Sequence, residues 1–351
     1  MKISILSAWN SDSGSGMHAE LLGREWIKMG HKVSVFSFIK SDFHGKNFLR
    51  EDELYVTRCF GTPRTNFFDP RPIVKTDMDI LVVEDLGMLP KDKLAKIFPL
   101  LREKAKTINI IHDNKLSPDS SFYQFRWNKV IVFDERYKKI FENIYKKKRV
   151  EIIPYPCSSW RGGDRDGARK KLNLPKDKKI IFIFGWWTAT FVPYFSIFKK
   201  VNQNYPLYIL VISKDKAVKK DYLKLGEKGI KIDFREKFIL PEDLYDYLHA
   251  ADVLVFGHKK TKGIVVCSTA LMCIGAGTPI VAPDSNFFET FNKEVFKYKN
   301  EKELKDDIIE AFKRGKRCKE ILTAAKIFVE KNNPRIIAKK YISLFKSLLS
   351  K

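Results

Sequence analysis

The chain has 351 residues, and its 66 Lys and Arg against 42 Asp and Glu give a formal net charge of +24. Hydrophobic residues make up 44%, which is typical of a globular protein and excludes a chain that is disordered throughout. The length predicts about two domains, because a domain has roughly 150 residues. No apolar run is long enough to predict a transmembrane helix, and the start lacks the apolar segment of a signal peptide. We therefore expect a cytoplasmic protein.

The basic excess is concentrated in particular segments. Residues 1–100 carry 14 basic and 13 acidic side chains, whereas residues 101–200 carry 23 and 10, and residues 301–351 carry 14 and 7. Such a distribution indicates a face that meets an anion, for which nucleic acid, anionic lipid and a nucleotide phosphate are the candidates. The alternative is a lysine-rich surface of the thermophile type, which the scarcity of glutamine also fits.

The cysteines indicate neither disulfides nor a zinc ribbon. Their number is five, which is odd, and no Cys-x-x-Cys pair occurs. Cys267 and Cys273 lie in an apolar stretch and are predicted to be buried thiols.

The first half of the chain alternates apolar runs with amphipathic segments. The apolar runs are continuous, which favours strands of a parallel sheet that is covered on both faces. Strands are predicted over residues 3–6, 33–38, 54–58, 80–83, 107–111, 130–133 and 150–153. Helices are predicted over residues 17–29, 91–105 and 135–146.

A second series follows a break at Pro154-Tyr155-Pro156-Cys157 and a turn-rich linker over residues 158–165. Strands are predicted over residues 179–184, 207–212, 231–234, 253–256, 279–282 and 294–298. Helices are predicted over residues 167–172, 193–204, 217–228, 241–250, 266–276, 301–314, 319–330 and 335–349. The last helix has a broad apolar face and needs a packing partner.

Two successive β/α series imply an α/β protein with two doubly wound, Rossmann-like domains that face each other across a cleft. We predict an N-terminal domain over residues 1–157, a C-terminal domain over 158–333 and a terminal helix over 334–351. Ligands of such open sheets bind at the carboxyl ends of the strands.

A glycine-containing segment follows the first predicted strand. Gly14, Ser15 and Gly16 begin a G-x-G-x-x-A pattern before a predicted helix, where glycine lets the backbone approach a phosphate. A long loop separates the strand from Gly14, which counts against a dinucleotide fingerprint. We interpret the segment as a glycine-rich loop that lines the cleft, and the alternative is a flexible connector.

Polar residues follow two other predicted strands. His112 and Asp113 come directly after residues 107–111, where the imidazole could donate to a sugar hydroxyl and Asp113 could orient it or act itself. A surface turn is the alternative. His258 lies in a similar place after residues 253–256. We expect no metal site, because no His, Cys and carboxylate residues have the spacing of metal ligands.

The stretch from Ala251-Asp252-Val253-Leu254-Val255 to Gly277-Thr278-Pro279-Ile280-Val281-Ala282 resembles the donor-binding region of the two-domain GT-B glycosyltransferases of family 4, also called group 1. Other segments that match this pattern are Gly14-Ser15-Gly16, Gly30-His31-Lys32-Val33, Ile153-Pro154-Tyr155-Pro156 and Ala168-Arg169-Lys170-Lys171-Leu172. The resemblance covers nearly the whole chain.

The resemblance implies transfer of a sugar from a nucleotide-sugar donor, usually with retention of configuration and without a metal or another cofactor. It places the nucleotide in the C-terminal domain and the acceptor, which would be a glycan, a lipid-linked molecule or a small molecule, against the N-terminal domain. It also implies that the final helix returns to the N-terminal domain. A role in glycan biosynthesis would follow, with the basic segments facing an anionic glycan or membrane surface.

The sequence departs from the family pattern in the donor site. The family's two glutamates fall on Ile264 and Met272, and no acidic residue lies between Asp252 and Asp284. No cation occurs in residues 180–198, where the family has its phosphate-binding Arg and Lys. We therefore expect the donor phosphates, or an acidic donor sugar, to be held by other residues. The candidates are Lys214, His258, Lys259, Lys260 and Lys262, with Ser268 and Thr269 on the following helix.

These departures leave open the reading as a non-catalytic GT-B relative. A sugar-nucleotide epimerase has the same two-domain plan and is a further alternative, but the sequence offers few acids and histidines for its cleft. A nucleic-acid-binding protein is disfavoured, because the basic runs at residues 146–149 and 313–317 match no recognition motif.

Overall fold

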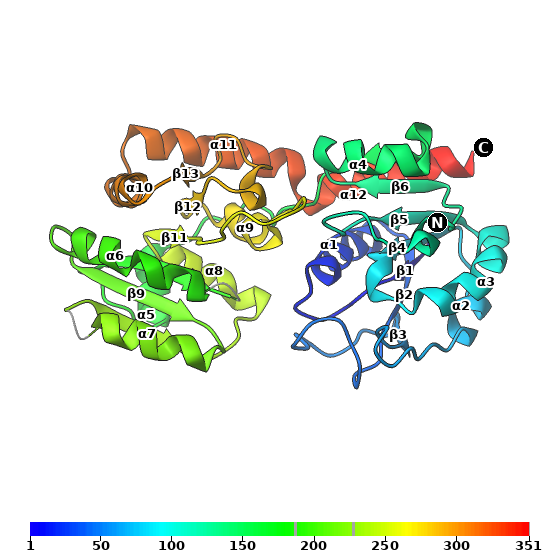
Figure 1. The fold of residues 1–351 in the computed structure, drawn as a ribbon, viewed down its shortest axis with the longest axis horizontal. Coiled ribbons are helices and arrows are strands. Elements are labelled where there is room, and N and C mark those ends of the chain that lie inside the picture. Colours follow the sequence, from blue (N-terminus) through cyan, green and yellow to red (C-terminus); the bar gives the residue numbers. More distant parts are fainter. Residues whose placement is uncertain (186–187, 227–228, 351) are drawn as a thin grey trace. The chain divides into compact units, whose positions relative to one another are not determined.

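The computed structural model describes residues 1–350 except 186–187 and 227–228. The chain forms two compact units (Figure 1). Unit 1 contains Met1–Pro156 together with the helix that starts at Pro334, and unit 2 contains Cys157–Asn333. Among the described helices, none combines the length and the apolar composition that crossing a membrane requires.

Unit 1 is built on a seven-stranded parallel sheet with the order β3-β2-β1-β4-β5-β6-β7. Its strands are β1 (Lys2–Leu6), β2 (Lys32–Phe38), β3 (Val56–Phe60), β4 (Ile80–Glu84), β5 (Lys106–Ile110), β6 (Lys129–Val132) and β7 (Val150–Ile152). All five residues of the central strand β4 are buried, which explains its continuous apolar sequence. The strand order reverses between β1 and β4, and in open α/β sheets ligands bind at this position.

The helices of unit 1 are α1 (Gly14–Lys28), α2 (Arg71–Lys75), α3 (Lys91–Lys104), α4 (Glu135–Tyr145) and α12 (Pro334–Leu349). Short 3-10 turns are η1 (Leu86–Met88), η2 (Ser120–Tyr123) and η3 (Lys147–Arg149).

The last helix, α12, packs against α1, as the sequence led us to expect (Figure 1). Trp26 of α1 is fully buried, and its ring lies 5.9 Å from that of Tyr341 and 5.4 Å from that of Phe345. Its indole nitrogen donates a hydrogen bond of 3.3 Å to the carbonyl of Ala338. Unit 1 is therefore completed by the final residues of the chain.

Unit 2 repeats the arrangement with a six-stranded parallel sheet of order β10-β9-β8-β11-β12-β13. Its strands are β8 (Lys179–Phe184), β9 (Leu207–Ile212), β10 (Lys231–Arg235), β11 (Val253–Val255), β12 (Ile280–Pro283) and β13 (Phe296–Tyr298). The order reverses between β8 and β11. The prediction of two doubly wound Rossmann-like domains is confirmed.

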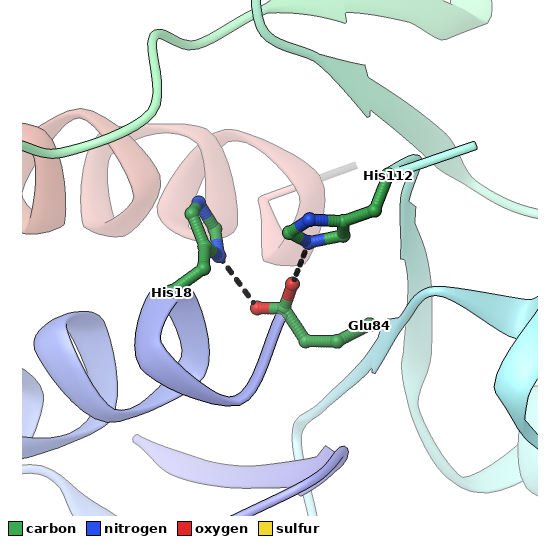
Figure 2. Close-up of side chains that lie close together, drawn as sticks. All are labelled: His18, Glu84 and His112. Atoms are coloured by element: carbon green, nitrogen blue, oxygen red, sulfur yellow. Dashed lines mark hydrogen bonds and ion pairs between the residues drawn. The ribbon is translucent and has the colours of Figure 1, made fainter. Parts of the chain in front are cut away.

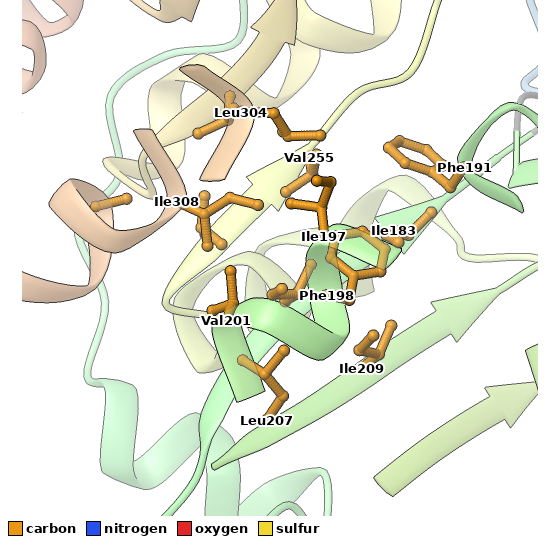
Figure 3. Packing of buried hydrophobic residues seen from close by; sticks show 14 of the residues in the cluster. Ile183, Phe191, Ile197, Phe198, Val201, Leu207, Ile209, Val255, Leu304 and Ile308 are labelled. Atoms are coloured by element: carbon orange, nitrogen blue, oxygen red, sulfur yellow. The ribbon is translucent and has the colours of Figure 1, made fainter. Parts of the chain in front are cut away.

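The helices of unit 2 are α5 (Arg165–Lys171), α6 (Phe195–Asn202), α7 (Lys216–Gly226), α8 (Pro241–Ala250), α9 (Ser268–Cys273), α10 (Glu301–Lys313) and α11 (Lys316–Asn332). Short 3-10 helices are η4 (Thr188–Tyr194), η5 (Ile274–Ala276) and η6 (Asn286–Phe288). Figure 3 shows how side chains of α6 and α10 pack on the sheet, with Phe198 and Ile308 among the fully buried residues. The five cysteines are buried and free, as predicted for Cys267 and Cys273.

Two predicted helices of unit 2 are shorter than expected. The helix predicted over 193–204 begins as α6 at Phe195, after the 3-10 helix η4. The helix predicted over 266–276 is helical only over α9, and it ends in η5 before Gly277, whose φ of +70° favours glycine.

The segment predicted as a linker, residues 158–165, is hydrogen-bonded to the rest of unit 2. The Ser158 amide donates to the carbonyl of Leu271 (3.1 Å), and the Arg161 amide donates to that of Gly275 (2.8 Å). A side chain on Gly275 would collide with this linker segment, because its Cβ would lie 2.5 Å from the Ser159 carbonyl oxygen. Glycine at this position therefore lets the backbone segments approach.

Asp252, just before β11, is the centre of a buried ion pair. Its Oδ2 accepts hydrogen bonds from the Arg169 guanidinium and from the Ile180 amide, each 2.7 Å long. Arg169 is 1% exposed and also donates to four backbone carbonyls, those of Ala250, Pro175, Lys176 and Lys178. Two residues that carried the family resemblance therefore hold α5 to the amino-terminal ends of the central strands β8 and β11.

Candidate functional site

The reversal of strand order in unit 1 brings together three titratable side chains. Glu84 is the last residue of β4, His18 lies near the start of α1, and His112 follows β5. The histidines are 66 and 28 positions from Glu84 in the sequence. Of the three, only His112 was a predicted site residue.

The Glu84 carboxylate lies between the two imidazoles (Figure 2). Its Oε1 is 2.9 Å from Nδ1 of His18, and its Oε2 is 2.8 Å from Nε2 of His112. The side chains of His18 and Glu84 are fully buried, whereas that of His112 is 11% exposed. Glu84 therefore joins a buried histidine to one that reaches the surface.

Aromatic rings enclose this cluster. The ring of His18 lies 4.8 Å from that of Tyr155 and 5.3 Å from that of Phe133, between ring centres. The Tyr155 hydroxyl donates to the carbonyl of Gly14 (2.6 Å) and so connects the enclosure to the start of α1. Nε2 of His18 is buried and has no hydrogen-bond partner among the described residues.

Burial among these rings shifts the pKa values of His18, Glu84 and His112. Burial lowers the pKa of His18 to about 3. Burial also lowers the pKa of His112, although the hydrogen bond and charge of Glu84 oppose this shift. Burial raises the pKa of Glu84, and the hydrogen bond from His112 opposes it. Both imidazoles are therefore held neutral, so each has one nitrogen that donates and one that accepts.

The same three residues are the one group in the described chain whose ligand atoms could converge on a metal, since these atoms lie within 4.8 Å of one another. The sequence spacing did not reveal this group, because the two histidines are 66 and 28 positions from Glu84. Metal-binding histidines usually donate their outer N–H to a partner, which His18 lacks here. We interpret the cluster as a hydrogen-bonded network, and the expectation that no metal is needed remains a prediction.

Asp113, predicted to orient His112, makes no hydrogen bond to it in the described structure, and Glu84 occupies that position. Asp113 instead lies near Asp85. Carboxylate oxygens of both residues come within 3.3 Å of the position that a Cβ on Gly87 would take. Burial raises the pKa of Asp113. Burial, and then the charge of Asp113, raise the pKa of Asp85 to about 7.

The raised pKa of Asp85 predicts a pH-dependent stability. The folded chain keeps this proton from about pH 4 to about pH 7, whereas the unfolded chain loses it near its ordinary pKa of 3.8. This contribution therefore favours the folded state below that window and is lost as the pH rises through it. Asp85→Asn suits the left-handed backbone there (φ 53°). We expect it to match the wild type near pH 4 and to have the higher urea midpoint at pH 8. An equal difference at both pH values would contradict this.

The segment predicted as a glycine-rich loop is the first turn of α1, which corrects that interpretation. Ser13 caps the helix, because its Oγ accepts from the amide of Gly16 (3.3 Å). A Cβ on Gly16 would lie 3.2 Å from the carbonyl oxygen of Ala8, so glycine lets the helix approach the loop after β1. The assignment of Gly14, Ser15 and Gly16 to donor binding remains a prediction.

In unit 2, the predicted donor residues lie on the loop between β11 and α9. Lys259, Lys260 and Lys262 are exposed, as a phosphate grip requires. His258 is 4% exposed and lies among the rings of Phe256, Phe287 and Phe288. Burial lowers its pKa to about 4, so it does not supply a charge at neutral pH. The assignment of His258 to donor binding remains a prediction, in which the ring would act as a neutral group.

A buried asparagine fixes the lysine loop. Nδ2 of Asn286 donates to the carbonyls of Thr261 (3.0 Å) and Gly263 (2.6 Å), and its Oδ1 accepts from the amide of Thr261 (3.1 Å). Asn286 follows β12, so the rule that sites lie at the carboxyl ends of strands could have indicated it. These bonds fix the backbone of the loop on either side of Lys262.

The remaining donor candidates lie on neighbouring elements. Ser268 and Thr269 are half-buried residues in the first turn of α9. Lys214 is exposed and follows β9. The lysine loop follows β11. Both β9 and β11 are hydrogen-bonded to β8, so Lys214 and the lysine loop come after the two neighbours of one strand.

No protein-family model matches the sequence. Solved structures match it along its whole length. Sucrose-phosphate synthase from Thermosynechococcus elongatus is 14% identical, with a TM-score of 0.71 and coverage of 100% of this chain and 99% of that one. The chain has the GT-B fold. A glycosyltransferase from Rickettsia africae ESF-5 is 16% identical, with a TM-score of 0.68 and coverage of 99% of this chain and 98% of that one. Anabaena HepE in complex with UDP-glucose is 13% identical, with a TM-score of 0.71 and coverage of 99% and 100%.

Proposed function

We propose that the protein is a glycosyltransferase of the family 4 type that moves a sugar from a nucleotide-sugar donor to a glycan, lipid-linked or small-molecule acceptor. The observation that supports this most is the full-length similarity to GT-B structures that were solved with UDP or UDP-glucose. In this chain, polar side chains also gather at the carboxyl ends of both parallel sheets, as ligand binding requires. Retention of configuration and independence of a metal are part of the proposal.

The diphosphate would be held by Lys259, Lys260 and Lys262. A nucleoside diphosphate leaves with growing negative charge, which fixed cations stabilise. The loop offers three exposed cations and no carboxylate that would repel the phosphates. Ser268, Thr269 and Lys214 would add contacts, and neutral His112 would meet the sugar or its acceptor. The basic excess of residues 101–200 and 301–351 suits an anionic acceptor or an anionic membrane surface.

Calorimetric titration with a panel of nucleotide sugars tests this function. The panel should vary the base and include uronic acid donors, because the basic loop would accept either a diphosphate or an acidic sugar. We expect at least one donor to bind with a Kd below 1 mM. If none does, the enzyme proposal fails and the reading as a non-catalytic relative takes its place.

Removing the loop charges should weaken donor binding. For the variant Lys259→Ala/Lys260→Ala/Lys262→Ala we expect an affinity loss of about 10- to 100-fold, because a hydrogen bond to a charged group contributes about 1.5–3 kcal/mol. The matched control is Lys316→Ala/Lys319→Ala/Lys326→Ala, which removes three exposed lysines of α11 in the same unit. Calorimetry on both variants should show the loss only in the first, and equal losses would mean a general charge effect.

A further inference from the structure

The two histidines beside Glu84 differ in what surrounds their outer nitrogens. Nε2 of His18 is buried and has no partner in the described part of the chain. His112 keeps an exposed edge, and its Nδ1 is not enclosed in this way. A proton on the outer nitrogen therefore has a different cost in the two rings. On His18 it would be a buried, unpaired donor, which costs about 1–3 kcal/mol, whereas on His112 water can accept it.

We propose that Glu84 is a positioning residue that holds His112 with its proton on Nε2 and so presents Nδ1 as a hydrogen-bond acceptor. The carboxylate accepts one N–H from each ring, at 2.9 Å from His18 and 2.8 Å from His112. These two bonds fix the tautomer of both imidazoles. His18 keeps its proton on Nδ1 and occupies the second carboxylate oxygen, so Glu84 cannot turn away from His112.

The consequence for recognition rests on the proposed glycosyltransferase function. An acceptor nitrogen at the surface selects a group that donates a hydrogen bond, such as a sugar hydroxyl. A carboxylate or a phosphate has no proton to donate and would be repelled by the lone pair. The group that meets His112 must therefore donate a hydrogen bond, as a sugar hydroxyl does, and an acidic sugar would have to carry its carboxylate elsewhere.

Glu84→Gln should change Nδ1 of His112 from a hydrogen-bond acceptor to a donor. The amide oxygen accepts one N–H, but the amide nitrogen donates and therefore needs an unprotonated ring nitrogen opposite it. One histidine must change its tautomer. The change falls on His112, because its outer proton can face water, whereas that of His18 would be buried without a partner. The variant would then present a donor where the wild type presents an acceptor.

Long-range nitrogen–proton NMR of the full chain with labelled histidine reads the tautomers directly. The protein has six histidines, and the spectra of His112→Gln and His18→Gln would assign the two signals. In the wild type we expect the proton on Nε2 of His112 and on Nδ1 of His18. In Glu84→Gln we expect the proton of His112 on Nδ1 and that of His18 unchanged. A wild-type proton on Nδ1 of His112 would overturn the proposal, whether or not the variant folds.

Glu20→Gln is the matched control for the spectra. Glu20 is also a buried glutamate of unit 1, but it pairs with Arg24 and not with a histidine. We expect it to leave both tautomers as in the wild type. If it shifts the proton of His112 as Glu84→Gln does, the effect is a general one of altered packing and the positioning role is refuted.

A kinetic measurement separates this proposal from the proposed function. With a donor that the wild type turns over, we expect Glu84→Gln to lower kcat/KM by at least about 100-fold, as loss of a correctly protonated histidine does. Unchanged kcat/KM would overturn the positioning role while the transferase function stands. If no donor is turned over but the spectra are as expected, the function fails and the tautomer assignment stands.

Discussion

Replacing Arg169 by leucine is expected to lower the free energy of unfolding by about 3–5 kcal/mol, because it removes the one buried cation that is hydrogen-bonded to the buried Asp252 carboxylate among the described residues. Asp252 is 5% exposed and receives its 2.7 Å hydrogen bond from the fully enclosed guanidinium. Four backbone carbonyls lose a donor at the same time. Urea unfolding of the full chain, followed by circular dichroism, should show a transition at much lower denaturant concentration.

Two further variants show whether burial causes this effect. Arg165 also faces Asp252, at 3.6 Å, but its side chain is 51% exposed. Arg165→Leu should therefore cost less than about 1 kcal/mol. The double variant Arg169→Leu/Asp252→Leu should be more stable than Arg169→Leu alone, since it removes the buried carboxylate that has lost its hydrogen-bonded cation. A double variant less stable than the single one would contradict this account of the site.

His112→Ala should lower kcat/KM by about 100- to 10,000-fold, the contribution of a positioned histidine in proton transfer or hydrogen bonding to the reacting group. The side chain is held by Glu84 at 2.8 Å and touches solvent at the carboxyl end of β5. Steady-state kinetics with the donor found by calorimetry measures this, and thermal unfolding checks that the variant folds.

His31→Ala is the control for this variant. His31 belongs to the same unit but follows α1 at its far end, where its Nδ1 faces the amino terminus of the chain at 3.5 Å. We expect its kcat/KM to stay within a factor of about two of the wild type, as for surface substitutions away from a site. A folded His112→Ala that is as active as His31→Ala would remove His112 from the catalytic residues.

The sequence predicted the fold well because both sheets are parallel and covered. Strands that are buried on both faces require continuous apolar runs, and such runs mark β4 and β9 clearly. β3 is the exception, predicted over 54–58 and found at Val56–Phe60, because it lies at the sheet edge and is only partly buried. Strands that alternate with helices along the chain, joined by right-handed connections, then favour a doubly wound topology.

The candidate site was predicted only in part, because its contacts join distant segments. His112 was found from its place after a strand, but nothing local distinguishes Glu84 from a residue that ends a strand near the surface. Its role depends on His18, which lies 66 positions away. The charge of His258 could not be judged either, because its titration depends on enclosure by aromatic residues some thirty positions further along the chain.

The return of α12 to α1 has a consequence for the order in which the protein is made. Trp26 is synthesised before unit 2, whereas Tyr341 and Phe345, whose rings lie beside it, are synthesised after unit 2. Unit 2 is continuous in sequence, so all of it has been translated before α12 exists. Domains commonly fold in the order of synthesis, from the amino terminus. Here unit 1 begins before unit 2 but is completed only after it. A chain that stops before α12 therefore leaves Trp26 without these ring partners.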